Sequence, residues 1–321
     1  MNRPSLSVIV CTHNPRPDYW TEMVAGLRRQ THPLDSWELV IVDNASTPPG
    51  IETSALSWHP NARVVPESQL GLTNARLRGI DETRGDLVVF VDDDNVLAAD
   101  YLATAESIAR QFSFLGAFGG NIAGRFERAP APWALPYLRY LAIVEVTEPQ
   151  WSNAIARNHC TPCGAGMCVR RSVAAAYARA LRQDSTRRAL DRVGESLSSG
   201  GDTDLALVAC DIGLGVGLFP QLRVEHLMPA GRVQLDYLCD LVRENHRSQV
   251  ILGALRGRPP SSVRSGRMER LLRFYQRLHL PQPVRRLEAA IDQGRAAGAE
   301  FLRQHPTIVP QVHSPSPSRA D

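Results

Sequence analysis

Asp92, Asp93 and Asp94 directly follow an apolar run, in the stretch LVVFVDDDNV at residues 87–96. Adjacent carboxylates repel one another, and a carboxylate at the end of a buried strand is costly unless a positive group neutralises it. Oxygen ligands suit Mg²⁺ or Mn²⁺, which proteins often bind through one or two carboxylates together with substrate phosphates. The run therefore predicts a divalent metal site. An alternative is a cluster that caps a helix expected to begin near residue 100.

The elements that must position these carboxylates alternate between strands and helices. Apolar runs predict strands at residues 6–11, 37–43, 62–67 and 86–92, and helical periodicity predicts helices at 18–30, 72–83 and 100–111. This alternation indicates an α/β fold with a mostly parallel sheet. Because ligands bind at the carboxyl ends of such strands, the polar stretches THN (12–14), DNAS (43–46) and DDDN (92–95) are expected to meet in one cleft.

Two further stretches could contact a nucleotide, and each has a plainer alternative. Asp43 ends the second strand, where an acidic residue often receives ribose hydroxyls or base donors; the alternative is an ordinary Asx turn. GLTNARLRG places Arg76 and Arg78 on the first turns of a helix. They could meet a pyrophosphate or a nucleobase, or they could lie on a solvated helix face.

Composition excludes several classes of function. A net charge of +3 is too small to indicate nucleic-acid binding. All 36 basic residues are arginine, which excludes Schiff-base chemistry and a phosphate-loop lysine. No apolar run is long enough to span a membrane, and the N-terminal run is too short for a secretory signal. The six cysteines are expected to be free thiols in a reducing cytosol. The Cys160/Cys163 spacing could suit zinc, but no second pair accompanies it.

The rest of the chain is less regular at first and then helical. Residues 126–157 predict an irregular excursion over the cleft; a strand at 166–171, a helix at 172–182, a helix opening near 204 and a strand at 217–227 follow. From residue 233 the pattern is helical, and 264–303 is rich in arginine. The Pro/Ser-rich segment at 305–321 is predicted to be a disordered tail.

Six motifs in order resemble glycosyltransferase family 2: SVIVCTHN, WELVIVDNAS, GLTNARLRG, LVVFVDDDNV, PCGAGMCVRR and GGDTDLALVACDIG. The resemblance covers residues 5–232. It implies the GT-A fold, a twisted, mostly parallel sheet flanked by helices, over residues 1–232. A Rossmann-like nucleotide-sugar half would occupy about 1–120 and an acceptor and catalytic half 121–232, followed by a helical extension at 233–304. The implied activity is metal-dependent, inverting transfer of a sugar from a nucleotide diphosphate donor to an acceptor hydroxyl.

The resemblance also assigns roles to individual residues. The donor nucleotide would be held by Thr12, His13, Asn14, Asp43, Arg76, Asp92 and Asp93. Asp94 matches the metal ligand of the family's D-x-D motif, for Mg²⁺ or Mn²⁺. Gly164, Ala165 and Gly166 match the glycine-rich acceptor-side strand. Asp202 matches the general base that deprotonates the acceptor hydroxyl.

Two departures from the family pattern stand on the acceptor side. Gly201 precedes Asp202 where the family commonly has glutamate, so a supporting acceptor contact could be missing. The family's Q-x-x-R-W element is absent, and VEHLMPAGR stands there instead, with His226 and Arg232. His226 could complete the metal shell or contact the diphosphate; as a lone histidine on a strand it could equally be structural.

Two other functions compete with this interpretation. A haloacid-dehalogenase-type phosphohydrolase would use Asp92 as nucleophile and Asp94 as acid/base. Its chemistry normally employs a lysine, or sometimes an arginine, and this chain has no lysine. This alternative also leaves CTHN and DNAS unexplained. An inactive sugar-nucleotide-binding module is the other alternative, supported by Gly201. For the glycosyltransferase, the expected partners are a nucleotide sugar and a glycan, lipid-linked or small-molecule acceptor. The expected location is the cytoplasm, with peripheral contact at the inner membrane face through the arginine-rich helices.

Overall fold

The computed structural model describes residues 4–48, 51, 53–154, 159–188, 190–192, 194, 197–258, 275 and 279–308. By its internal contacts the chain divides into two units, residues 1–238 and 239–321. The first part of the arginine-rich segment, residues 264–274, lies outside the described residues, as does most of the tail predicted at 305–321. The described start of that tail contains a 3₁₀ segment at Pro306–Ile308, so the prediction of disorder is wrong there.

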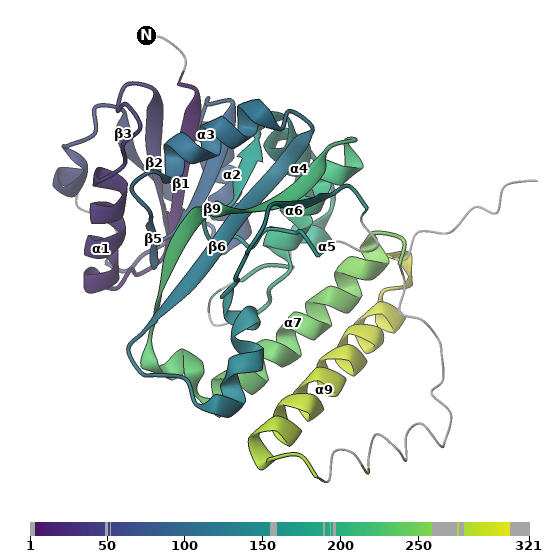
Figure 1. Ribbon diagram of the computed structural model, residues 1–321. Helices are drawn as coiled ribbons and strands as arrows, with labels where there is room; N and C mark the ends of the chain where they lie inside the picture. The colour runs from purple at the N-terminus through teal and green to yellow at the C-terminus, as the bar shows by residue number, and fades with distance from the viewer. Residues whose placement is uncertain are drawn as a thin grey trace, which may run out of the picture. The chain divides into compact units, whose positions relative to one another are not determined.

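The first unit is built on one mixed sheet (Figure 1). In its described part the strand order is β3-β2-β1-β4-β8-β6-β9-β5, and β7 pairs with β9. The strands are β1 (Leu6–Thr12), β2 (Trp37–Asn44), β3 (Ala62–Glu67), β4 (Leu87–Asp92), β5 (Asn95–Leu97), β6 (Leu115–Phe126), β7 (Gln150–Ser152), β8 (Cys168–Arg170) and β9 (Gly215–Met228). Strands β1 to β4 pair in parallel, whereas β8 joins β4 to β6 through antiparallel pairings. The part of the sheet built from β1 to β4 is thus parallel, and the part built from β8, β6, β9 and β5 is mixed.

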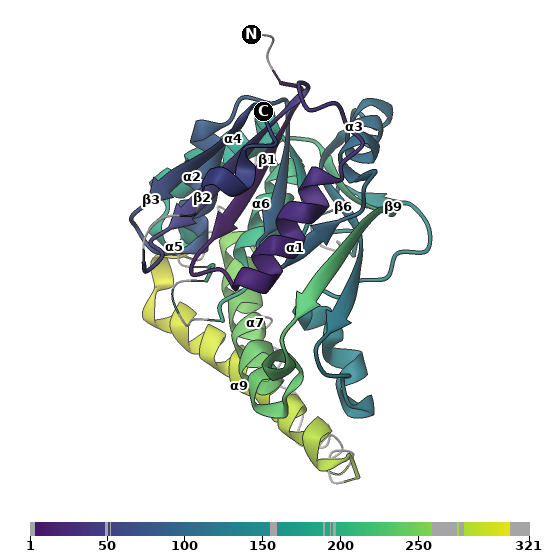
Figure 2. The same ribbon diagram turned by 90° about the vertical axis from the view of Figure 1, so that its left-hand side faces the viewer.

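Helices cover both faces of this sheet. They are α1 (Pro17–Arg28), α2 (Leu72–Glu82), α3 (Tyr101–Gln111), α4 (Arg171–Gln183), α5 (Ser185–Arg188) and α6 (Gly201–Asp211), with short 3₁₀ segments η1 (Thr53–Leu56), η2 (Pro132–Leu141) and η4 (Ala230–Val233). Alternate residues of β1 face opposite layers: Val8 belongs to a buried cluster with residues of α1 and α3, and Ile9 to one with residues of α2, α4 and α6. Figure 2 shows the arrangement of these helices around the sheet. Burial on both faces explains why β1 and β2 are almost continuously apolar.

The alternating pattern located the first half of the sheet well. The predicted strands at 6–11, 37–43, 62–67 and 86–92 correspond to β1, β2, β3 and β4, and the three predicted helices correspond to α1, α2 and α3. The helix expected near residue 204 begins at Gly201, which places Asp202 in its first turn. Residues 126–157, predicted to be irregular, contain η2 and β7. The strand β5 follows the aspartates directly, so the helix-capping alternative for them is wrong.

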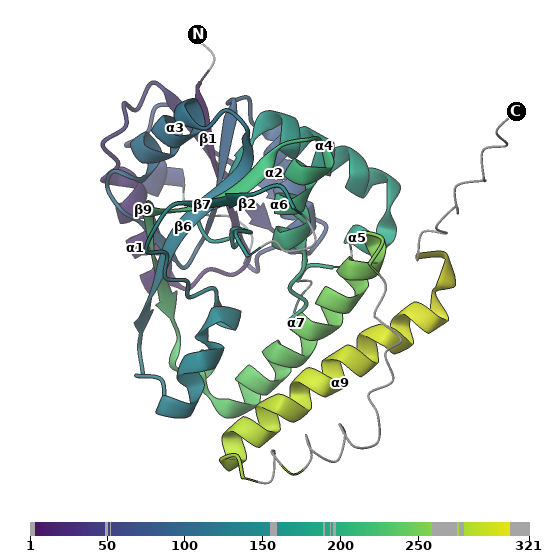
Figure 3. The same cartoon turned by 45° about the vertical axis from the view of Figure 1, so that its right-hand side comes forward.

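The second unit contains most of α7 (Leu235–Leu255), followed by α9 (Gln282–Gln304) and η5 (Pro306–Ile308). The two long helices lie side by side (Figures 1 and 3). Gly294 and Gly298 of α9 lie against the backbone of Arg243 and the side chain of Val250 on α7, where a larger residue would collide. No helix in the described part of the chain combines the length and hydrophobicity needed to cross a bilayer.

Candidate active site

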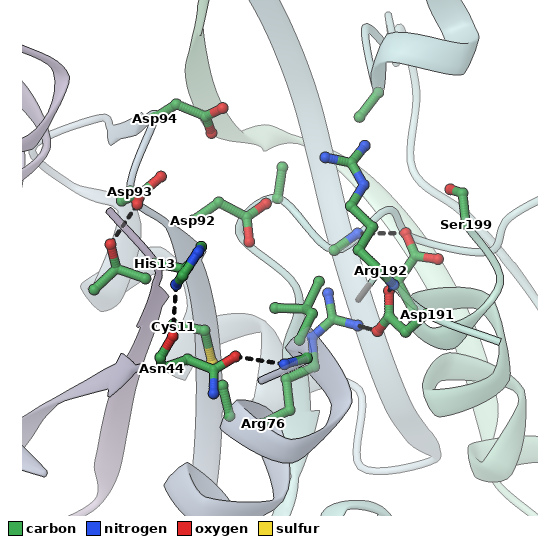
Figure 4. Close-up of a pocket in the computed structure, with 18 of the residues that line it drawn as sticks. Cys11, His13, Asn44, Arg76, Asp92, Asp93, Asp94, Asp191, Arg192 and Ser199 are labelled. Atoms are coloured by element: carbon green, nitrogen blue, oxygen red, sulfur yellow. Dashed lines mark hydrogen bonds and ion pairs between the residues drawn. The ribbon is translucent and has the colours of Figure 1, made fainter. Parts of the chain in front are cut away.

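A cavity of about 320 Å³ opens in the first unit where β1, β2 and β4 end (Figure 4). Of the residues predicted for the site, it is lined by Thr12, His13, Arg76, Asp92, Asp93, Asp94, Gly164, Ala165, Asp202 and His226. Residues that the sequence did not assign to the site also line it: Cys11, Asn44, Tyr140, Asp191, Arg192, Ser199 and Arg232. Asn14, Asp43 and Gly166, all within the described ranges, are not lining residues.

The end of β1 supplies one wall. Thr12 donates a hydrogen bond from its hydroxyl to the Asp93 carboxylate. His13 is held by a 2.7 Å contact between its Nδ1 and the carbonyl oxygen of Asn44. Asn14 has a left-handed backbone, and its side-chain oxygen accepts the Thr47 N–H at 2.7 Å. Asn14 therefore joins the loops after β1 and β2, which fixes the neighbouring His13 at the cavity.

The end of β2 presents Asn44 to the cavity. The Asp43 carboxylate accepts the N–H of Ser46, three residues further on, at 3.3 Å, and so holds the loop that follows β2. The Asn44 amide donates to the carbonyl of Gln69 at 2.8 Å and accepts the N–H of Gly71 at 2.8 Å. Asn44 thereby holds the loop between β3 and α2 against the cavity.

The three aspartates differ in their neighbours and in their charge state. Burial and, after it, the Asp94 carboxylate raise the pKa of Asp93 from its ordinary 3.8 to about 7. Burial and Asp94 likewise raise the pKa of Asp92. Burial opposes ionisation of Asp94 as well, but His226 and Arg232 outweigh it and hold its pKa well below the ordinary value. Asp94 is therefore the most firmly ionised member of the run.

Strand pairing brings His226 to Asp94. Asn95 of β5 is opposite His226 of β9, and the Leu227 N–H donates to the Asp94 carbonyl at 2.8 Å. The His226 Nε2 lies 3.3 Å from the Asp94 Oδ2, and the Arg232 Nη1 lies 3.0 Å from that same oxygen. The His226 Nδ1 is buried and has no hydrogen-bond partner among the described residues.

The opposite wall carries the residue predicted to be the base. Asp202 lies in the first turn of α6, and its Oδ2 accepts the N–H of Gly164 at 3.0 Å while its Oδ1 accepts the Thr203 N–H at 2.7 Å. The glycine-rich segment and Asp202 thus meet as predicted. Gly166 lies one step away from the cavity, and its carbonyl accepts the hydroxyl of Tyr101.

The two arginines of α2 differ in their burial and in their partners. Arg78 is 42% exposed and pairs with Glu82 on its own helix, as expected for a solvated face. Arg76 is 4% exposed and pairs with Asp191, which is 5% exposed, at 2.7 Å. Burial raises the pKa of Asp191 against the opposing effect of Arg76. Asp191 stands in a stretch without periodicity, so sequence reasoning missed it. The one signal in the sequence was Gly201, which stands beside Asp202 where the family commonly has glutamate.

Comparison with known proteins identifies the family. The sequence pattern of "Glycosyl transferase family 2" matches residues 7–174, just over half of the chain. The chain belongs to glycosyltransferase family 2. This membership overturns the phosphohydrolase alternative, in which Asp92 was a nucleophile.

Two curated relatives match over shorter stretches. The putative glycosyltransferase EpsH of Bacillus subtilis is 29% identical over 103 residues, which are 32% of this chain and 29% of that protein. An uncharacterised protein of Sinorhizobium fredii, y4gI, is 31% identical over 105 residues, 32% of this chain and 11% of that protein. The matches therefore span less than a third of either relative.

A solved structure supports the fold over nearly the whole chain. The mannosyltransferase PcManGT from Pyrobaculum calidifontis, determined in complex with GDP-Man and Mn²⁺, superposes with a TM-score of 0.51 at 19% identity. The match covers 96% of this chain and 81% of that one. The family 2 member described here has the predicted GT-A fold.

Proposed function

We propose that this glycosyltransferase transfers a sugar from a nucleotide diphosphate donor to an acceptor hydroxyl, with inversion at the anomeric carbon and Asp202 as general base. The observation that carries the proposal is a single cavity with the acidic run on one wall and Asp202 on another. The Gly164 and Thr203 N–H groups hold the Asp202 carboxylate in place. A base fixed in this way can take the acceptor proton as the hydroxyl attacks.

The donor's nucleoside would lie at the ends of β1 and β2. Thr12, His13 and Asn44 line the cavity there, and Asn14 and Asp43 support them through backbone contacts. Arg76, Arg192 and Arg232 also face the cavity. Their charges suit a diphosphate, because guanidinium groups form strong charge-assisted hydrogen bonds with phosphate oxygens.

The residues present fit a divalent cation that is bound together with the donor. No group of three or more His, Cys, Asp or Glu side chains in the described ranges is placed to hold a metal unaided. Asp94 and His226 offer two donor atoms 3.3 Å apart, which suits Mg²⁺ or Mn²⁺ that fills its shell with phosphate oxygens and water. The cation would act as a Lewis acid that stabilises the departing diphosphate.

Arg232 bears on this fit directly. Its Nη1 lies 3.0 Å from the Asp94 Oδ2 and 3.4 Å from the His226 Nε2, so a guanidinium occupies the space beside both donors. The side chain has to move when a cation binds. It is then placed to contact the diphosphate that accompanies the cation.

A panel of UDP-, GDP- and dTDP-sugars, scored by thermal shift with and without Mn²⁺, tests donor binding. GDP-mannose with Mn²⁺ is the first pair to try, since the similarly folded PcManGT was solved with both. Stabilisation is expected only when donor and metal are present together. Stabilisation by no donor would refute the proposal. Binding without turnover in any acceptor screen would favour the inactive-module alternative instead. The anomeric configuration of a product, read by NMR, tests inversion.

Contact with anionic lipid is a separate proposal for the second unit. Helix α9 exposes Arg285, Arg286, Arg295 and Arg303. Co-sedimentation with vesicles of phosphatidylserine and phosphatidylcholine is expected for the full chain and reduced when these four arginines are replaced by glutamine. Equal binding by both proteins would refute the contact.

A further inference from the structure

Gly201 leaves room for a carboxylate that comes from elsewhere in the chain. It is a buried residue at the start of α6, and its backbone lies outside the left-handed region, so conformation does not require glycine here. A Cβ atom at this position would lie 2.6 Å from the Cγ of Asp191 and 2.9 Å from its Cβ. Both are closer than real contacts allow. The Asp191 carboxylate therefore fills the space into which a side chain at position 201 would extend.

The backbone around Asp191 is fixed on both sides. The carbonyl of Leu190 accepts the Gly200 N–H at 3.0 Å, which ties the segment to the start of α6. The carbonyl of Arg192 accepts the Leu72 N–H at 2.9 Å, which ties it to the start of α2. The carboxylate is consequently held between the helix that carries Asp202 and the helix that carries Arg76.

Arg76 has more than one carboxylate within reach. Its Nη1 pairs with the Asp191 Oδ2 at 2.7 Å, and Asp202 and Asp92 also act on its charge. Gly164 lies between Arg76 and Asp202: a Cβ there would be 2.8 Å from the Arg76 Nη2 and 3.4 Å from the Asp202 Cβ. The charged and titratable groups facing this pair are Asp92 (β4), Asp202 (α6), Tyr177 (α4), Cys11 (β1) and Arg192.

We propose that Asp191 is a positioning residue for sugar transfer, an inference that rests on the proposed function. Its carboxylate takes the place of a side chain at position 201 and binds Arg76, which keeps that guanidinium from pairing with Asp202. An arginine bound to Asp202 would stabilise the carboxylate form and make it a weaker base. Asp191 thus leaves Asp202 free to accept the proton of the acceptor hydroxyl.

Asp191→Asn tests the proposal by kinetics. With the donor selected by the sugar-nucleotide panel, kcat is expected to fall about 10-fold or more, within the range general-base catalysis contributes. The acid limb of the kcat/KM profile should move to lower pH, a shift that simple destabilisation would not produce. If the wild-type protein transfers sugar and the variant has the same kcat and the same pH profile, the inference about Asp191 is wrong and the proposed function stands.

A carboxylate exchange provides the second test. Gly201→Glu is expected to lower kcat by itself, because its side chain collides with Asp191, and Asp191→Ala is expected to lower it by freeing Arg76. The double variant restores a carboxylate in the emptied space, so its kcat should exceed that of both single variants. A double variant no better than the poorer single one would contradict the proposal.

Glu38→Gln is the matched control for loss of a buried, arginine-paired carboxylate. Glu38 is near the start of β2, at the end of this strand that is away from the cavity, and it pairs with Arg63 at 2.9 Å. Its replacement should lower the unfolding temperature without moving the pH profile of activity. If it moves that profile as Asp191→Asn does, the effect reflects general destabilisation and the inference is wrong.

A crystal structure of the full-length Asp191→Asn variant needs no turnover. Arg76 is expected to lie within about 3.2 Å of an Asp202 oxygen in that structure. An Arg76 that keeps its present position would overturn the inference even if sugar transfer itself is confirmed.

Discussion

The two ends of the parallel strands each bury carboxylates in a polar surrounding, but with opposite outcomes. Near the start of β2, Glu38 accepts hydrogen bonds from the Ser7 hydroxyl at 2.7 Å and the Arg84 N–H at 2.6 Å, and it pairs with Arg63. Burial opposes its ionisation, yet these donors prevail and lower its pKa. Its oxygens are satisfied by the protein, which identifies this end as structural.

At the other end of the parallel strands, three carboxylates stand next to one another, and their partners among the described residues gather mostly on one of them, Asp94. Asp92 and Asp93 have raised pKa values because they are buried beside Asp94. The repulsion between these carboxylates lowers the stability of the chain without ligands, and a cation bound together with the donor would reduce that repulsion. The difference teaches that burial alone does not mark a functional carboxylate. The distinguishing property is an incomplete set of partners at a cavity.

Among these variants, Asp202→Asn should show the largest difference between the two ends of the parallel strands, because it should affect turnover and not stability. Loss of the base is expected to reduce turnover about 10²–10⁴-fold, because proton removal then falls to water. The free energy of unfolding and the donor affinity should change little. Steady-state kinetics, with donor titration by calorimetry, measure both. Turnover close to that of the wild type would exclude Asp202 as the base.

Glu38→Ala should give the reverse pattern. It removes the acceptor of the Ser7 hydroxyl and of the Arg84 N–H and the carboxylate partner of Arg63, so the free energy of unfolding is expected to fall by about 2–4 kcal/mol. Urea unfolding measures this loss. Activity per folded molecule, assayed well below the unfolding temperature, should remain at the wild-type level. A large loss of activity in folded protein would mean that the two ends are coupled.

Asp94→Asn addresses the cation at the cavity end. Removal of this ligand is expected to weaken Mn²⁺ binding in the presence of a nucleoside diphosphate by at least about 10-fold. Calorimetric titration of Mn²⁺ measures the change, and Asp100→Asn, at an exposed residue directly before α3, serves as the control. Equal Mn²⁺ affinities in wild type and Asp94→Asn would place the metal elsewhere.

The smallest effect is a pair of opposite pH slopes in the metal-free chain. The pKa of Asp93 is raised from 3.8 to about 7, so the folded state binds an extra proton between those values and stability falls as pH rises through that window. The lowered pKa of Glu38 works in the other direction, and stability falls as pH drops below its ordinary 4.5. Unfolding at several pH values should show Asp93→Asn flattening the first slope and Glu38→Gln the second. Unaltered slopes would contradict these assignments.

Sequence patterns located the parts of the fold whose signal is local. Continuous apolar runs followed by polar residues marked β1, β2 and β4, since both faces of these strands are buried. The strand β6 was missed because LGAFGGNIAGRF carries four glycines, which weaken the β signal. The strand β5 is too short to show a period.

The site was predictable as far as its motifs reach. Asp43 and Asn44 could not be told apart, because adjacent strand residues point to opposite faces and one of them alone lines the cavity. Asp191 lies 115 residues from its partner Arg76, and the link exists only in the folded chain. The sequence marks this place only by a glycine at position 201. The glycine can be explained once the structure shows that the Asp191 carboxylate lies beside it.

The short pairing of β5 with β9 makes this site sensitive to insertions and deletions in the segment that follows Asp94. Asn95, Val96 and Leu97 are opposite His226, Glu225 and Val224, and side chains along a strand alternate between faces. Deleting one residue after Asp94 would shift this register by one step and disturb the contact between Asp94 and His226. Substitutions in β5 are therefore expected to be tolerated far better than insertions or deletions, because the three-residue strand acts as a spacer of fixed length.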